Sequence, residues 1–516
     1  MTTLSANPHA PAAAAKMPPQ IPYIIGNEGC ERFSFYGMRN ILTMFLMTSL
    51  LMAVPEDLRK AEAKEVFHTF VIGVYFFPLL GGWLADRFFG KYPTIFWLSL
   101  LYCAGHACLA IFENNLRGFY FGLFLISLGS GGIKPLVSSF VGDQFDKSNR
   151  SLAQKVYDAF YWIINFGSFF ASLLMPLILK KYGASIAFGL PGVLMALATL
   201  ILWSGRHKYV HEPARGANPH SFLKVVLTAL KAGGLGLSVA VLGLGLAAYS
   251  LSQMGSLGFV PAVCLALVLV MAFGGVGAAL QLERARGVHP DDAVDGVRAV
   301  LRVLVLFALV TPFWSLFDQK ASTWVLQANQ MTKPEWFESS MMQALNPALV
   351  MILIPFNNLV LYPLLERTGV RVTALRRMGA GIALAGAAWI VAGVLQLWLD
   401  AGNAVSIVWQ MLPYALLTLG EVLVSATGLE FAYSQAPLSM KGTIMSFWSL
   451  SVTVGNLWVL LSNISIKSPS ALAAIQSTGY SETACLMFFF AGFALVAAAV
   501  FGLVARRYPM LNNYRG

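Results

Sequence analysis

The residues of this chain best suited to chemistry are ionisable side chains inside long apolar segments. The first such segment contains the run GNEGCERFSFYGMRN, and at 100° per residue one helical stripe holds Tyr36 and four charges: Glu28, Glu31, Arg32 and Arg39. A charge at the centre of a bilayer costs roughly 2.5–3.5 kcal/mol, so its presence usually marks a function. Snorkelling to the headgroups would explain Glu28 and could explain Glu31, but Arg39 lies about 16 Å further along the helix. We therefore expect this stripe to be functional.

Three later segments each carry a charge of the same kind. Lys134 follows the glycine-rich run SLGSGGI and precedes Pro135, a combination that allows close helix approach and weakens the helix locally. Asp318 lies four residues after Trp314, so the two share a helix face. Glu421 falls near the middle of TLGEVLVSATGLEF. For Lys134, pairing with an acid purely for packing is the structural alternative.

Several uncharged or weakly basic residues are weaker candidates. His68 and Tyr75 are seven residues apart and so lie close to one helix face. His68 could titrate near physiological pH, or it could be a hydrogen-bonded interior histidine. Asn165 and Asn346 are amides beside Gly or Pro, and such residues more often hold helices together than bind ligand. Trp448 could belong to a core or to the wall of a site.

The composition shows what must position these residues. Hydrophobic residues make up 57% of the 516 residues and charged residues 11%, with a mean hydropathy of +0.67. This excludes a disordered chain, a fibrous repeat and an ordinary soluble enzyme. About 20 residues cross a bilayer. Fourteen segments meet that length: 28–52, 66–86, 93–113, 117–141, 158–179, 184–204, 222–251, 257–282, 299–327, 340–365, 373–399, 403–432, 439–464 and 483–505.

Lys and Arg concentrate in the loops on one side of these segments and in the C-terminal tail, so the positive-inside rule places both termini in the cytoplasm. The same rule explains the net charge of +11 better than nucleic-acid binding does. The seventh and eighth segments have almost no ionisable residue, which favours an accessory hairpin facing lipid. We expect no signal peptide in residues 1–20, no disulfide and no metal or other cofactor. The chain has no GxSxG, HExxH, P-loop or CxxC pair, so neither an enzyme nor an ATP-driven pump is expected.

Four motifs resemble known families. The run GGWLADRFFGKYPTI resembles the loop motif of the major facilitator superfamily, in which Asp86 and Arg87 would hold helix ends together. The runs EGCERFSFYG, FYWIINFGSF and GLEFAYSQAPLSMKG resemble, in order, three signatures of proton-dependent oligopeptide transporters of the bacterial type. Two positions depart from that pattern, because Phe35 replaces a tyrosine and Leu136 stands where some bacterial members have Asn.

The resemblance implies an all-α polytopic membrane protein with the major facilitator fold, in which two six-helix bundles flank an inserted two-helix hairpin. We expect an N-terminal tail (1–21), an N-terminal bundle (22–205), linkers with the hairpin (206–298), a C-terminal bundle (299–507) and a tail (508–516). The implied proton-coupling residues are Glu28, Glu31, Arg32, Asp318 and His68. The implied substrate-binding residues are Arg39 and Lys134 for a peptide carboxylate, Glu421 for its amino terminus, and Tyr36, Tyr75, Asn165, Trp314, Asn346 and Trp448 along the cavity.

Together these features predict proton-coupled symport of di- and tripeptides into the cell by alternating access, in the inner membrane and as a monomer. A peptide is a zwitterion, so fixed cations on one bundle and a fixed anion on the other would bind its two charged ends. Such a site would accept peptides with many different side chains. A carrier of another small zwitterion or anion, such as an amino-acid conjugate or nitrate, and a nutrient sensor without turnover are the alternatives. In the empty protein we expect two ion pairs between the bundles, Arg39 with Asp318 and Lys134 with Glu421.

Overall fold

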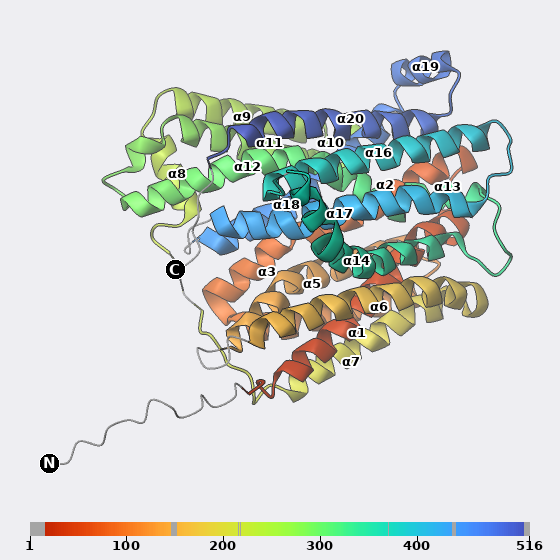
Figure 1. Cartoon of the computed structure of the whole chain (residues 1–516), viewed down its shortest axis with the longest axis horizontal. Helices are drawn as coiled ribbons and strands as arrows, with labels where there is room; N and C mark the ends of the chain where they lie inside the picture. Colours follow the sequence, from red (N-terminus) through yellow and green to blue (C-terminus); the bar gives the residue numbers. More distant parts are fainter. Residues whose placement is uncertain are drawn as a thin grey trace.

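The computed structural model describes residues 16–145, 152–214, 216, 218–369, 371–435 and 440–509, and the regular elements of these ranges are helices. Most of the two expected tails, and residues 436–439 of the GLEFAYSQAPLSMKG motif, lie outside the described residues. Figure 1 shows long helices running roughly side by side along the longest axis of the molecule. We call the side with the start of α1 (Ile21–Phe45) and the end of α20 (Glu482–Arg506) the terminal face (Figure 1). The side with α13 (Thr323–Gln330) and α19 (Pro469–Thr478) is the opposite face.

The first part of the chain forms a group of helices around one apolar core. Its buried side chains include Phe45, Phe119 and Phe188, whose rings contact one another at 4.9–5.3 Å between centroids. The elements of this group are α1 (Ile21–Phe45), η1 (Leu46–Leu50), α2 (Glu56–Phe76), α3 (Pro78–Leu84), η2 (Ala85–Phe89), α4 (Lys91–Ile111), α5 (Leu116–Asp143), α6 (Ala153–Tyr182) and α7 (Ala184–Ser204).

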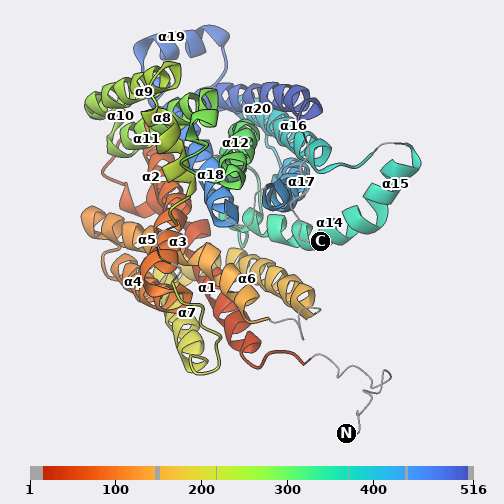
Figure 2. The ribbon, with the colours of Figure 1, turned by 90° about the vertical axis from the view of Figure 1, so that its left-hand side faces the viewer.

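A second core lies in the last part of the chain and includes Trp324, Trp389 and Tyr414. Figure 2, viewed from the terminal face, shows the first group in the lower part of the picture and the second group above it and to the right. The elements of this group are α12 (Asp291–Asp318), η5 (Gln319–Ala321), α13 (Thr323–Gln330), η6 (Ser339–Ala344), α14 (Leu345–Phe356), η7 (Asn357–Leu361), α15 (Tyr362–Arg367), α16 (Ala374–Asp400), η8 (Ile407–Gln410), α17 (Met411–Gln435), α18 (Lys441–Ser465), α19 (Pro469–Thr478) and α20 (Glu482–Arg506).

Between the two groups the chain forms a hairpin against the outside of the molecule. Its elements are α8 (Phe222–Lys231), α9 (Leu235–Ser252), α10 (Met254–Leu257), α11 (Phe259–Leu280) and η4 (Leu282–Ala285). The segment predicted as one helix over 222–251 is two, because Gly233 and Gly234 adopt φ values of 76° and 82° between α8 and α9. Cys264 of α11 packs with Ile72 of α2 and Leu460 of α18, so the hairpin covers the seam where the two groups meet.

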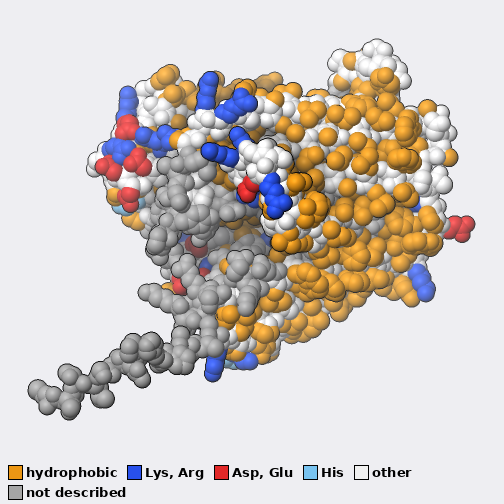
Figure 3. Space-filling model, in the orientation of Figure 1, with side chains coloured by type: hydrophobic (Ala, Val, Ile, Leu, Met, Phe, Trp, Pro, Cys, Tyr) orange, Lys and Arg blue, Asp and Glu red, His pale blue; other side chains and the backbone are white. Residues whose placement is uncertain are grey.

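Thirteen helices of the described residues are long and apolar enough to cross a membrane. The 25-residue α1 is not among them, because four charges interrupt its apolar sequence. Because α1 is long enough to cross a membrane, it brings the number of such helices among the described residues to fourteen, the number predicted from the sequence. Figure 3 shows a broad apolar surface along the helices, with most of the visible Lys and Arg side chains toward the terminal face.

Candidate functional site

A buried ion pair joins the two groups of helices at the centre of the molecule. Arg39 Nη2 of α1 lies 2.7 Å from Asp318 Oδ1 at the end of α12, and both side chains are less than a tenth exposed. The Arg39 guanidinium also lies over the Phe67 ring, 5.2 Å from its centroid. The expected pairing of Arg39 with Asp318 is therefore present. Breaking such a pair would leave an uncompensated charge in a dry environment.

Asp318 belongs to a longer polar network. Asn456 Nδ2 of α18 donates to Asp318 Oδ2 at 2.8 Å, and the Asn456 amide oxygen lies 2.6 Å from His68 Nδ1 of α2. Because the amide donates to a carboxylate, its oxygen faces the imidazole, and His68 Nδ1 must carry the hydrogen. His68 Nε2 lies 2.9 Å from the Ser322 hydroxyl. A neutral imidazole accepts from that hydroxyl and a protonated one donates to it, so the network can hold an extra proton after one hydroxyl rotation.

The charged stripe of α1 forms a separate cluster about two to three turns from Arg39. Arg32 Nε lies 2.5 Å from Glu28 Oε1 and 3.2 Å from Glu31 Oε2, and all three residues are buried. Neither carboxylate oxygen of Glu31 has a hydrogen-bond partner among the described groups. Tyr36 lies beside this cluster, with its ring against Phe35 at 5.4 Å. Glu31 is therefore held by its charge interaction with Arg32 and not by a hydrogen bond.

Lys134 lies where glycines bring α5 close to its neighbours. A Cβ at Gly131 would lie 2.5 Å from the Val74 carbonyl of α2, and one at Gly129 would lie 2.7 Å from the Leu98 carbonyl of α4. This close packing is what the glycine-rich run predicts. Lys134 Nζ sits 3.2 Å from the centroid of the Phe35 ring, a cation–π contact with the residue that replaces a tyrosine of the motif.

The expected pairing of Lys134 with Glu421 is wrong for this structure. No hydrogen bond or ion pair joins these two described residues, and the charges that act most strongly on Lys134 are those of Glu28, Glu31, Arg32 and Arg39, all on α1. The reason is geometric, because α5 packs against α1 and α2 of its own group and holds the ammonium there.

Glu421 is instead bound by Asn346, which connects it to a lysine that the sequence analysis did not single out. The Asn346 amide donates to Glu421 Oε2 at 2.5 Å and to Thr418 Oγ1 at 3.1 Å. Its oxygen accepts from Lys320 Nζ at 2.8 Å. Lys320 follows Asp318 by two residues in FDQKAST, so an ionisable residue inside an apolar segment was the signal that could have found it. Asn456 and Ser322 had no comparable signal.

Two of the predicted cavity residues, Trp314 and Trp448, are buried in the second apolar core. Trp314 and Trp448 contact each other edge to face at 5.8 Å, and Gly455 allows this packing because a Cβ there would lie 2.5 Å from Trp314. Tyr75 packs against both apolar cores and lies 5.7 Å from Lys134 Nζ. Asn165 is buried and donates to the Tyr161 carbonyl of its own helix.

Contacts that close the molecule between its two groups of helices lie toward the opposite face. Thr43 Oγ1 donates to the Ala321 carbonyl at 2.7 Å, and Gln343 Nε2 donates to the Asn40 carbonyl at 2.9 Å. Nearer the surface, Lys180 lies 2.7 Å from Glu338, and Lys467 lies 3.1 Å from Glu65. At the terminal face, Lys91 of α4 and Asp143 of α5 form an ion pair within the first group, 2.6 Å apart.

Asp86 and Arg87 are exposed in η2, and neither forms an ion pair with another described residue. Within this motif, Lys91 of α4 forms an ion pair with Asp143 of α5 and joins the ends of the two helices.

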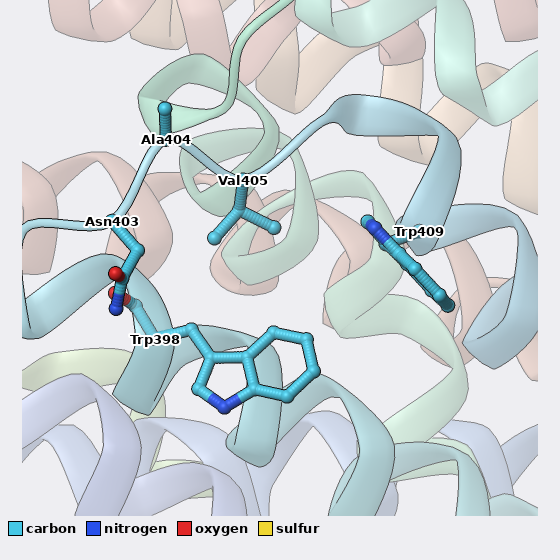
Figure 4. Close-up of a pocket in the computed structure, with 5 residues that line it drawn as sticks. All are labelled: Trp398, Asn403, Ala404, Val405 and Trp409. Atoms are coloured by element: carbon cyan, nitrogen blue, oxygen red, sulfur yellow. The ribbon is translucent and has the colours of Figure 1, made fainter.

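Figure 4 shows a pocket, lined by Trp398, Asn403 and Trp409, in the loop after α16 at the opposite face. It has no charged lining residue and includes none of the predicted site residues.

Comparison with known proteins agrees with this arrangement. Residues 92–477 match the sequence profile of the POT family. The chain belongs to the POT family. This is a family of transporters and not a class of enzymes, and the predicted fold class is confirmed. The crystal structure titled as the POT family transporter PepTSo is 69% identical, with a TM-score of 0.94 over 96% of this chain and 99% of that chain.

Two curated relatives of this POT chain are more distant. Solute carrier family 15 member 2 of Rattus norvegicus is 31% identical over 420 residues, which cover 75% of this chain and 51% of the relative. Peptide transporter family 2 of Caenorhabditis elegans is 33% identical over 405 residues, which cover 75% and 48%. The POT chain thus spans about half the length of the curated relatives it matches.

Proposed function

We propose that this protein is a proton-coupled symporter that carries di- and tripeptides into the cell by alternating access. The observation that carries the proposal is that cations from one group of helices and an acid from the other lie inside the molecule. Arg39 and Lys134 suit the carboxylate of a peptide, and Glu421 suits its ammonium. Several relatives are named as peptide transporters. A nitrate-like anion would offer nothing to Glu421, so the peptide is the better substrate.

The network around Asp318 supplies a route for coupling. Arg39 is held by Asp318 while the site is empty, so a peptide carboxylate must compete for it. A proton that reaches Asp318, through His68 or from the α1 acids, weakens that pair and frees Arg39 for the substrate. Because the pair joins α1 to α12, its release also loosens the contact between the two groups of helices. Proton and peptide binding would then favour the same rearrangement.

We further propose that the terminal face is cytoplasmic and that the protein functions as a monomer in the inner membrane. The basic loops at that face support the orientation by the positive-inside rule (Figure 3). The described polar contacts between the groups close the opposite face, so this structure corresponds to a state closed toward the outside. The domain limits 22–205, 206–298 and 299–507 are proposed on the same basis, since the two apolar cores fall on either side of the hairpin.

Uptake of dialanine into proteoliposomes tests the function. An inward proton gradient and a negative interior should drive accumulation, and one coupled proton supports roughly a 40-fold gradient from 100 mV alone. Tripeptides should compete and free alanine should not. Equal accumulation with and without the proton gradient would contradict proton coupling, and competition by free alanine as strong as by peptides would contradict the substrate class.

A further inference from the structure

A buried lysine occupies the acidic end of the proposed peptide site. Lys320 lies in η5 directly after α12 and is 5% exposed. Its ammonium donates to Asn346 Oδ1 at 2.8 Å, and the same amide donates to Glu421 Oε2 at 2.5 Å. The amide orientation is fixed, because its NH₂ group faces the oxygens of Glu421 and Thr418 while its carbonyl faces the ammonium.

The charges nearby direct Lys320 toward Glu421. Asp318 is held by Arg39 and Asn456, which leaves Glu421 as the acid that attracts Lys320 most strongly. The positive charge of Arg39 repels Lys320 from the Asp318 side. The ammonium also makes a cation–π contact with the Phe317 ring, with Nζ 3.3 Å from the ring centroid. No direct ion pair joins Lys320 to Glu421, so the Asn346 amide transmits the contact.

The amino terminus of a peptide is the same chemical group as this side chain, a primary ammonium with three donors. We propose that Lys320 is a resident ammonium that neutralises the Glu421–Asn346 end of the site until the amino terminus of a peptide displaces it. Lys320 is then a specificity-determining residue, because it sets how much the site gains from a free amine. The inference rests on the proposed peptide transport.

Removal of the resident charge has opposite effects on two ligands. In Lys320→Gln the empty site contains an uncompensated Glu421, so dialanine, which brings an ammonium, binds more tightly. N-acetyl-dialanine has the same carboxylate and side chains but no ammonium, so it leaves Glu421 buried without a counter-charge and binds more weakly. The ratio of the two dissociation constants therefore rises, whatever the variant does to overall affinity.

The experiment measures binding of both compounds to the purified full-length protein by calorimetry. We expect the preference for dialanine over N-acetyl-dialanine to rise about tenfold or more in Lys320→Gln, which corresponds to about 1.4 kcal/mol. Lys320→Met, which also lacks the charge but retains the apolar stem over Phe317, should shift the ratio in the same direction. The matched control is Lys320→Arg, which keeps a cation and should stay within about threefold of the wild-type ratio.

The outcomes separate this inference from the proposed function. If the wild-type protein binds dialanine and the ratio of the two dissociation constants is unchanged in both Lys320→Gln and Lys320→Met, the role of Lys320 is overturned and the proposed function is not. Equal gains for both ligands would also overturn it, since they would mean that Lys320 only fills space. Wild-type protein that binds neither compound would overturn the proposed function and this inference with it.

Discussion

His68 Nδ1 lies 2.6 Å from the amide oxygen of Asn456, and this contact joins α2 to α18 across the two groups of helices. The same amide donates to Asp318, so one side chain connects an imidazole to the acid that holds Arg39. His68, Asp318 and Asn456 are all buried, so water cannot replace Asn456 as the hydrogen-bond partner of the other two. We propose that Asn456 couples the protonation of His68 to the strength of the Arg39–Asp318 pair.

Replacing this amide with an apolar side chain of similar size should disconnect the network. In Asn456→Leu, His68 Nδ1 and Asp318 Oδ2 each lose a partner, and we expect the free energy of unfolding to fall by about 1–3 kcal/mol. Proton-driven dialanine uptake should fall about tenfold or more. Thr453→Val is the matched control, because Thr453 is buried on the same helix and its hydroxyl has no described partner. Equal activity of the two variants would remove Asn456 from the coupling route.

The Arg39–Asp318 pair should contribute to function more than to stability. Asp318→Leu leaves the Arg39 guanidinium buried without a counter-charge, which should cost about 3–5 kcal/mol of stability. Adding Arg39→Met removes the stranded charge, so the double variant should recover most of that loss while uptake stays abolished. Thermal unfolding in detergent and uptake in proteoliposomes measure the two effects. A double variant as unstable as Asp318→Leu would show that shape, and not charge, holds this contact.

The two acids of α1 should differ in their contribution. Glu28 holds Arg32 at 2.5 Å, whereas the Glu31 oxygens have no hydrogen bond among the described groups. Glu31→Gln removes a proton acceptor without removing a ligand, so proton-driven uptake should be lost while peptide counterflow persists. Glu28→Gln should instead lower stability, because Arg32 loses its shortest contact. If Glu31→Gln abolished counterflow in a folded protein, Glu31 would be a substrate ligand and not a proton carrier.

The sequence predicted which segments cross the membrane because apolar length and interrupting charge are properties of single segments. The stripe of Glu28, Glu31, Arg32 and Arg39 is local to one helix, and the structure contains it on α1. The pairing of Arg39 with Asp318 was also predicted, because either charge would be costly to leave unpaired in a dry site. Unlike the stripe, this pair depends on how the helices are placed around one another.

Other contacts depend on that placement and could not be predicted. Lys134 was expected to reach Glu421, but close packing of α5 on α2 and α4 directs it to the Phe35 ring. Asn346 of α14 donates to Glu421 and accepts in turn from Lys320 of η5. Asn456 has neither charge nor a motif, so its role follows only from its position between Asp318 and His68.

The linkers around the hairpin contain a pH-sensitive contact outside the membrane-spanning helices. His220 Nδ1 lies 2.9 Å from His289 Nδ1, and His289 Nε2 lies 2.9 Å from the Thr228 hydroxyl of α8. One Nδ1 must accept while the other donates, so the contact fails when both rings are protonated. Burial, together with the neighbouring His220 and Lys224, lowers the pKa of His289 below 6.5.

A lowered pKa means that the folded linker binds this proton less readily than the unfolded one. The stabilisation is therefore complete above pH 6.5 and is lost as the pH falls below that value. Amide hydrogen exchange in α8 and the start of α12, corrected for intrinsic rates, should become faster as the pH is lowered from about 7.5 to about 5.5. His289→Gln should remove this dependence, whereas His211→Gln, which alters an imidazole against Tyr92, should retain it. An unchanged pH profile in His289→Gln would assign the effect to other groups of the linker.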